Sequence, residues 1–103
     1  MQPFTEEVIR IIKNIPAGYV MTYGQIAAEA GSPRAARQVV RILHAMSRAH
    51  QLPWHRVVNA KGEIALQDEE GKMTQIMELE SEGVEIGKGD RIDLAVYQYF
   101  PSS

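Results

Sequence analysis

The stretch 22–37, TYGQIAAEAGSPRAAR, decides the fold. Thr22 followed three residues later by Gln25 forms a capping box, in which both side chains satisfy free backbone groups at the start of a helix. Gly31 is expected to end that helix, because glycine readily adopts the left-handed conformation. Ser32-Pro33 then predicts the cap and first position of a second helix. Two helices joined by so short a turn indicate a helix-turn-helix.

The second helix, roughly Pro33 to Met46, would be the recognition helix. Its inward face is apolar and comprises Ala36, Val39, Val40 and Leu43. Its other side carries basic residues at helical spacing: Arg34, Arg37, Arg41, His44 and Arg48. An ordinary exposed face mixes charges of both signs, so this stripe without acids favours contact with DNA phosphates. The small Ala35 and Ala36 would let the backbone approach DNA closely. An ordinary solvated basic face stays open as the alternative.

Apolar spacing outside this motif predicts further elements. We expect a scaffold helix over 1–15 and a last helix over Lys72 to Glu82, ended by Gly83. Between them, two short apolar segments flank a Lys61-Gly62 turn and predict a hairpin, the wing of a winged helix. The segments are Val57-Val58-Asn59 and Ile64-Ala65-Leu66, followed by an acidic loop over Gln67 to Gly71. The fold class is therefore mostly α with a small β-wing, a winged helix-turn-helix.

The C-terminal part is expected to be extended. Ile92, Leu94 and Val96 stand at every second position, in the manner of a strand. The aromatic residues Tyr97, Tyr99 and Phe100 would anchor the end of the chain. With 103 residues, the chain is predicted to form one domain over 1–103.

Composition limits the possible chemistry. The sequence contains no cysteine, which excludes disulfides, thiol catalysis and cysteine-ligated zinc. Its three histidines lack ligand-like spacing, so no metal or other cofactor is expected. No apolar run reaches the ~18 residues that a membrane helix needs, and no signal-peptide pattern begins the chain. The expected compartment is the cytoplasm, with the protein associated with DNA.

Charge is unevenly distributed along the chain. Residues 1–62 hold eight Lys and Arg against three Asp and Glu, whereas residues 63–103 hold three against ten. The overall charge of −2 therefore hides a basic half and an acidic half. The basic half could meet phosphates, and the acidic half is a candidate surface for a protein partner.

The segment Pro53-Trp54-His55-Arg56-Val57-Val58 closely resembles the active-site signature P-C-H-R-V of the O6-alkylguanine-DNA alkyltransferases. Other matching pieces lie in the same order: Ile15-Pro16-Ala17-Gly18, 22–27, 31–37 and Glu82-Gly83. In that family the cysteine accepts an alkyl group from damaged guanine. Tryptophan at the cysteine position, in an otherwise intact frame, resembles the alkyltransferase-like proteins.

The resemblance implies minor-groove binding and flipping of the damaged nucleotide into a pocket. Arg37 matches the arginine finger that fills the space left by the base, since a guanidinium both stacks and donates hydrogen bonds. Tyr23 matches the tyrosine that presses on the target phosphate. Trp54 would supply a flat apolar wall. The lesion pocket would comprise Tyr23, Trp54, His55, Arg56, Gln67 and Glu82, and the DNA-binding residues would be Tyr23, Arg34, Ala35, Ala36, Arg37 and Arg41.

In the transferases, the residues matching His55 and Glu82 activate the cysteine, and the residue matching Arg56 fixes the loop. Here the pair could shape the pocket floor, which we favour, or activate a water molecule. Some relatives carry a basic residue near the position of Gln67 that could read the charge of the damaged base, and this chain has none there, so the resemblance does not define how lesions would be distinguished.

We therefore expect a non-enzymatic sensor that binds double-stranded DNA containing O6-alkylguanine, as a monomer, and flags it for nucleotide excision repair. One alternative is a winged-helix transcription regulator without lesion recognition. Another is a hydrolase that acts on modified bases through His55-Glu82.

Overall fold

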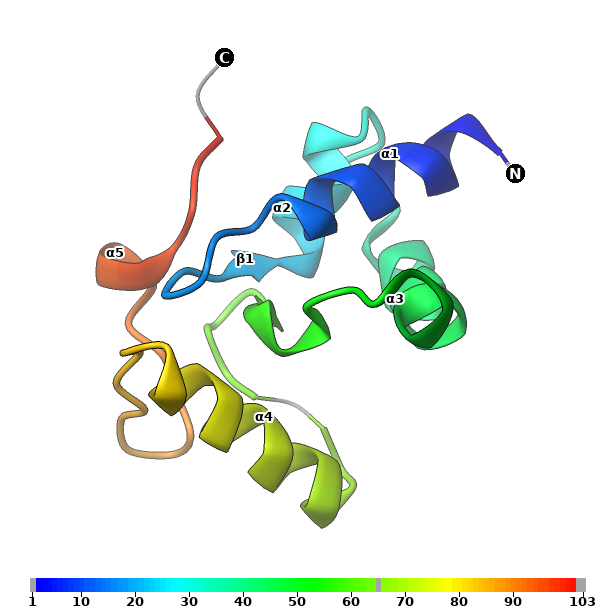
Figure 1. The fold of residues 1–103 in the computed structure, drawn as a ribbon. Helices are drawn as coiled ribbons and strands as arrows, with labels where there is room; N and C mark the ends of the chain where they lie inside the picture. Colours follow the sequence, from blue (N-terminus) through cyan, green and yellow to red (C-terminus); the bar gives the residue numbers. More distant parts are fainter. Residues whose placement is uncertain (1, 65, 102–103) are drawn as a thin grey trace.

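The computed structural model describes residues 2–64 and 66–101, and it is mostly helical with one small sheet (Figure 1). The predicted fold class is confirmed. In chain order the elements are α1 (Pro3–Lys13), β1 (Met21–Thr22), α2 (Tyr23–Glu29), α3 (Ala36–His50), the short 3₁₀ helix η1 (Trp54–Arg56), β2 (Val57–Val58), α4 (Glu69–Ser81) and α5 (Leu94–Tyr97).

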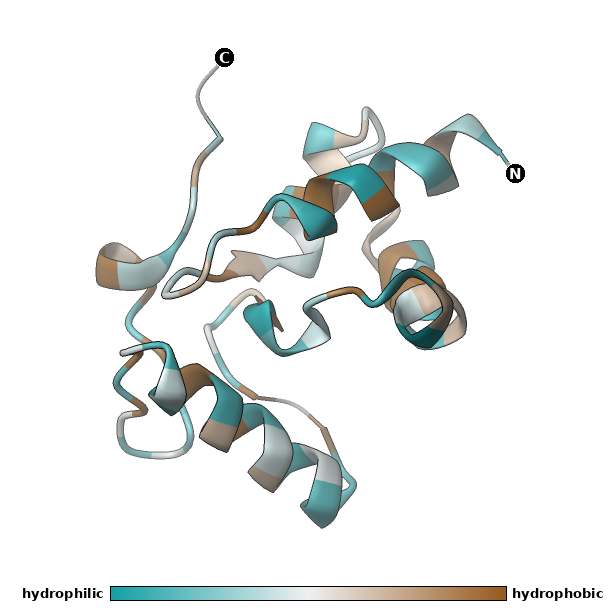
Figure 2. Cartoon of the chain, viewed as in Figure 1, coloured by the Kyte–Doolittle hydropathy of each residue, from teal (hydrophilic) through white to brown (hydrophobic). Residues whose placement is uncertain are grey.

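Two apolar clusters hold the chain together. The first lies among α1, α2 and α3, and the second lies under α4 and the C-terminal segment. The first includes Ile12, Ile15, Met21, Ile26, Val39, Leu43 and Val57; the second consists of Val20, Val58, Ile64, Leu79, Val84 and Ile92. Both α1 and α3 alternate hydrophobic and hydrophilic stretches, as helices with one buried face do (Figure 2).

The sheet joins the two clusters, and its pairing differs from the predicted hairpin. Strand β2 runs parallel to β1, with Met21 opposite Val57 and Thr22 opposite Val58. Both residues of β2 are buried, so the strand needs cover on both faces and lies inside the molecule. The predicted hairpin is therefore wrong. Its second segment includes Ala65, which lies outside the described residues.

The turn within that hairpin is nevertheless present. The Asn59 side-chain oxygen accepts hydrogen bonds from the backbone N–H groups of Lys61 and Glu63, both at 2.9 Å, and Gly62 has a left-handed φ of 78°. Beyond the turn the backbone pairs with the C-terminal segment: Ile92 donates to the Gly62 carbonyl at 2.8 Å. A partner distant in sequence thus replaces the neighbouring segment.

The helix-turn-helix is present, but its second helix runs from Ala36 to His50 and not from about Pro33 to Met46 as predicted. The capping box of α2 is confirmed, since the Thr22 side chain accepts from Gln25 N–H and the Gln25 side chain accepts from Thr22 N–H. Ser32 accepts a hydrogen bond from Ala35 N–H at 2.9 Å, so Pro33 is the second residue of a tight turn, a position that proline also favours.

Helix α4 begins earlier than predicted, and the expected acidic loop is its first turn. Asp68 caps it by accepting from Gly71 N–H at 3.0 Å, and acids are favourable at a helix N-terminus. Gly83, with φ 91°, ends the helix as predicted. Val84 donates to the Leu79 carbonyl at 3.0 Å, and both side chains are buried in the second cluster, which is the pattern of a Schellman cap.

The C-terminal segment is helical where a strand was expected. Asp93 caps α5 by accepting from Ala95 N–H at 3.0 Å. Beyond α5 the chain lies beside β1, because Val20 exchanges backbone hydrogen bonds with Tyr97 and Tyr99. Phe100 is 69% exposed and does not anchor the end. Within the described ranges, no helix combines the length and apolarity that a membrane crossing requires.

Candidate functional site

All the residues of the basic stripe of the helix-turn-helix are exposed to solvent. Arg37, Arg41, His44 and Arg48 on α3 are exposed, and Arg34 is exposed in the turn before it. The opposite side of α3 is held in the first cluster by buried Val39 and Leu43. Among the described residues, none of these basic side chains forms an ion pair within the chain. The positive charges of the four arginines are therefore available to an external anion.

A cavity of about 110 Å³ opens where α2, α3, η1 and α4 meet. The predicted pocket residues Tyr23 and Trp54 both line it. His55, Arg56, Gln67 and Glu82 are not among its lining residues, and Gln67 is exposed on the chain just before α4. The full lining is Tyr23, Leu43, His44, Ser47, Trp54, Val57, Leu66 and Gln75.

Trp54 opens η1, where Pro53 precedes it. Its half-buried ring packs against the first apolar cluster and meets the His55 ring edge to face, with the centroids 6.3 Å apart. The same indole also borders a shallow open groove beside the cavity, together with Ser47, Arg48, Gln51 and Leu52. Trp54 therefore forms a wall that can be reached from outside the protein.

Tyr23 reaches the cavity from the first turn of α2, whose start is fixed by the capping box. Burial raises the pKa of the Tyr23 phenol, so the hydroxyl keeps its proton at neutral pH. A protonated phenol can donate a hydrogen bond to a phosphate while its ring packs against apolar groups.

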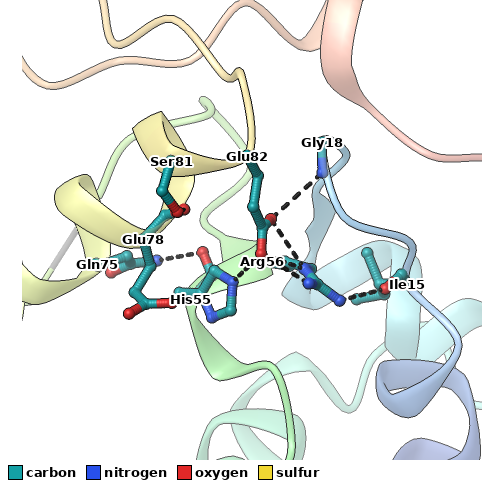
Figure 3. A network of polar contacts seen from close by, with 8 residues as sticks. All are labelled: Ile15, Gly18, His55, Arg56, Gln75, Glu78, Ser81 and Glu82. Carbon is teal, nitrogen blue, oxygen red and sulfur yellow. Dashed lines mark hydrogen bonds and ion pairs between the residues drawn. The ribbon is translucent and has the colours of Figure 1, made fainter.

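A polar cluster behind the cavity is centred on Glu82, the C-cap of α4 (Figure 3). His55 Nε2 lies 2.8 Å from Glu82 Oε2. Arg56 donates from Nε to both carboxylate oxygens at 3.0 and 3.2 Å, and from Nη2 to Oε2 at 2.6 Å. Gly18 N–H donates to Oε1 at 3.3 Å, while Arg56 Nη1 donates to the Ile15 carbonyl at 2.8 Å. The cluster thus joins the end of α4, η1 and the loop after α1.

The ionised form of Glu82 is strongly favoured. Burial acts to raise its pKa, but the hydrogen bonds from Arg56, His55 and Gly18 outweigh burial and lower the pKa to about 2. A carboxylate already bonded to an arginine and to a backbone N–H is a weak proton acceptor. The arrangement suits a structural anion better than a base that activates a nucleophile.

Gln75 is a site residue that the sequence did not reveal. It is 3% exposed, lines the cavity, and donates through Nε2 to the carbonyls of His55 and Val57, both at 3.1 Å. It therefore fixes the backbone on either side of Arg56. The available signal was its position four residues before the buried Leu79, on the inward face of α4.

No metal centre competes with this site in the described part of the chain, where no group of three or more His, Asp or Glu side chains is placed to hold an ion.

Comparison with known proteins finds similarity to alkyltransferase, alkyltransferase-like and DNA base-flipping proteins. Residues 3–84 match the family model of the 6-O-methylguanine DNA methyltransferase, DNA binding domain. A DNA base-flipping protein of Escherichia coli is 45% identical over 96 residues, which cover 93% of this chain and 74% of that protein. Alkyltransferase-like protein 1 of Schizosaccharomyces pombe is 41% identical over 87 residues, covering 84% and 81%.

Solved structures of an alkyltransferase-like protein and of a methyltransferase have a similar fold. A crystal structure of the S. pombe alkyltransferase-like protein in complex with damaged DNA containing O6-carboxymethylguanine superimposes with a TM-score of 0.86 at 37% identity, covering 98% of both chains. The Mycobacterium tuberculosis O6-methylguanine methyltransferase gives a TM-score of 0.64 at 26% identity, covering 93% of this chain and 55% of that one.

Proposed function

We propose a function from one established premise: this chain belongs to the family of the 6-O-methylguanine DNA methyltransferase DNA-binding domain. It is a DNA damage sensor that binds O6-alkylguanine in duplex DNA and flips the damaged nucleotide. It does not repair the base, because alkyl transfer in this family uses a cysteine thiolate and the chain contains no cysteine.

The observation that carries this proposal is the position of Trp54. The residue follows Pro53, where the transferases carry their nucleophile, and its indole lines the same cavity as the Tyr23 phenol. An indole cannot take the alkyl group, but it can stack on a flipped base, which contributes roughly 1–3 kcal/mol. The position that carries the nucleophile in the transferases thus serves in this chain to recognise the flipped base.

The basic stripe supplies the affinity for DNA, and Arg37 supplies the finger. Helix α3 would dock in the minor groove, with Arg34 and Arg41 on phosphates and the small Ala35 and Ala36 close to the backbone. Flipping costs a few kcal/mol of lost stacking. The Arg37 guanidinium offsets part of that cost by stacking within the duplex and bonding the orphaned base. Tyr23 presses on the adjacent phosphate.

The size of the cavity bears on how the base is held. A dry cavity of roughly 150 Å³ accommodates one benzene ring, whereas guanine has two fused rings and the cavity here measures about 110 Å³. We therefore expect the lining side chains to shift when the nucleotide inserts. Gln67, exposed on the chain just before α4, would lie at the pocket mouth, with Glu82, His55 and Arg56 behind the wall.

Binding without chemistry benefits a cell only if another system removes the lesion. We infer that the protein acts as a monomer, associated with DNA in the cytoplasm, and flags the lesion for nucleotide excision repair. We also propose that residues 1–103 form a single DNA-binding domain with the alkyltransferase-like helix-turn-helix.

The test is a pair of titrations at fixed physiological salt, because phosphate contacts make affinity depend on salt. One duplex carries a single O6-methylguanine and the other is identical but undamaged. The recovered duplex is then assayed for the alkyl group. Preference for the damaged duplex with the lesion intact supports a sensor. Equal binding favours a plain DNA-binding regulator, and loss of the alkyl group would revive water activation by His55-Glu82.

A further inference from the structure

Helix α4 is apolar on two sides. Gln75 and Leu79 are buried toward the rest of the protein. Met73 and Met77 lie about half a turn away around the helix and are 52% and 64% exposed. Their spacing of four residues places the two thioether side chains next to each other. A pair of large apolar side chains is thus presented to solvent.

Acidic side chains border this pair. Glu69, Glu70 and Glu80 fall on the same side of the helix by their spacing, and all three are exposed. The five residues Glu69, Glu70, Met73, Met77 and Glu80 are called here the α4 outer face. Lys72 is the only basic residue in α4, and it is engaged elsewhere, with Nζ 3.3 Å from Asp90 Oδ2. The α4 outer face therefore carries negative charge alone.

The α4 outer face points away from the cavity. Gln75, on the opposite side of the helix, lines the cavity and bonds the backbone around η1. In Figure 1, α4 forms the lower edge of the molecule. DNA bound at the cavity would leave this face uncovered, and its charge would oppose contact with phosphates.

We infer that the α4 outer face docks a protein partner whose surface offers an apolar slot bordered by lysine or arginine. Methionine adapts its shape and suits a surface that must fit a slot. Complementary charge around the slot would speed association and exclude wrong partners. DNA and an anionic membrane would both be repelled. Two methionines make a small anchor, which fits a transient complex.

This inference extends the proposed function by naming the surface through which a marked lesion would be handed on. It relies on lesion recognition only for that role, since the surface chemistry itself is independent of DNA.

The test uses two synthetic peptides that contain the same numbers of leucine and lysine residues. One forms an amphipathic helix, and the other has the same residues in scrambled order. Each is titrated into the full chain carrying ¹³C-labelled methionine methyl groups. We expect the amphipathic peptide to shift the Met73 and Met77 signals and to bind about tenfold more tightly than the scrambled one. The variant M73Q/M77Q should lose about tenfold in affinity, and E69Q/E70Q/E80Q should lose several-fold. Glutamine is a good helix former, so α4 should persist in both.

Matched controls remove the same groups elsewhere. E6Q/E29Q/E85Q removes three exposed glutamates, and V96Q/F100Q removes two exposed apolar side chains; neither should change peptide binding. Equal binding of the two peptides, or unchanged affinity in M73Q/M77Q, would overturn the inference. A dimer in sedimentation that M73Q/M77Q abolishes would assign the face to a second copy of the chain and also overturn it.

The same variants are then titrated with the O6-methylguanine duplex and should bind it like the wild-type protein. Loss of lesion binding in M73Q/M77Q would place the α4 outer face in the DNA site and contradict the inference. If the wild-type protein shows no lesion preference, the proposed function fails, while the peptide titrations still decide the docking surface.

Discussion

Acid should destabilise the protein through Glu82. In the folded state the carboxylate is bonded by Arg56, His55 and Gly18, and its pKa is lowered from 4.5 to about 2. A pKa that is lower in the folded than in the unfolded state means that ionised Glu82 stabilises folding. That stabilisation is complete above the unfolded pKa and is lost as the pH falls toward 2.

The magnitude follows from the gap between the two pKa values. A gap of roughly 2.5 units at 1.36 kcal/mol per unit corresponds to about 3 kcal/mol of stability at neutral pH. Linkage places the loss of about 2 kcal/mol of this between pH 6 and pH 3. A small domain has only about 5–15 kcal/mol in total, so the effect should be readily measured.

The assay is urea unfolding followed by the fluorescence of Trp54, the single tryptophan of the chain, at several pH values from 7 to 3. Glu82→Gln should be about 3 kcal/mol less stable than wild type at pH 7, and the gap should narrow as the pH falls. Glu63→Gln is the control, because the Glu63–Arg91 pair lies at the surface with a separation of 3.0 Å and exposed pairs contribute little. Parallel pH profiles for wild type and Glu82→Gln would refute this account of the cluster.

Trp54→Ala should weaken binding to the O6-methylguanine duplex by about 1–3 kcal/mol and weaken binding to undamaged DNA less. The control Tyr19→Ala removes an exposed aromatic ring that does not line the cavity and should change neither affinity. Equal losses of both affinities in Trp54→Ala would show that Trp54 is not part of the pocket. Arg37→Ala should abolish the fluorescence rise of a base analogue on flipping, and an unchanged signal would reject the finger. Trp54→Cys should acquire slow transfer of a radiolabelled alkyl group to the protein, and an unlabelled protein would argue against an intact activation dyad. Gly62→Ala should destabilise folding by about 2 kcal/mol or more, because an added Cβ would collide with the Ile92 carbonyl at a left-handed φ; Gly31→Ala, left-handed with open space around it, should cost about half as much.

Features that depend on neighbouring residues could be predicted from the sequence. The capping box of Thr22 and Gln25 and the Gly83 cap of α4 each rest on hydrogen bonds within a few residues, so the local pattern specifies them. Ser32-Pro33 shows the limit of such patterns. Proline suits both the first position of a helix and the second position of a turn, and only the wider fold selects the turn.

Features that depend on distant partners could not be predicted. Strand β2 pairs with β1, which lies 36 residues earlier in the chain. A short apolar pair such as Val57-Val58 does not determine which strand will pair with it. The same reason hid Gln75, whose role depends on the rotation of α4 about its axis. Trp54 and Tyr23 were found through the family resemblance, and the structure brings both to one cavity.

The cluster around Glu82 has a use that does not require a thiolate. Its hydrogen bonds reach the Ile15 carbonyl and Gly18 N–H in the loop after α1, and they reach η1 through His55 and Arg56. Ile15 of this loop belongs to the first apolar cluster and Leu79 near the end of α4 belongs to the second, so Glu82 holds the two parts together at the segment that carries Trp54. A wall that recognises a flipped base must keep its position, because stacking depends on the distance and angle between the rings. A His–Arg–Glu set that positions a reactive cysteine in a transferase would thus position an unreactive indole equally well. On this reasoning, loss of Glu82 should lower lesion selectivity together with stability, although no proton is transferred at the site.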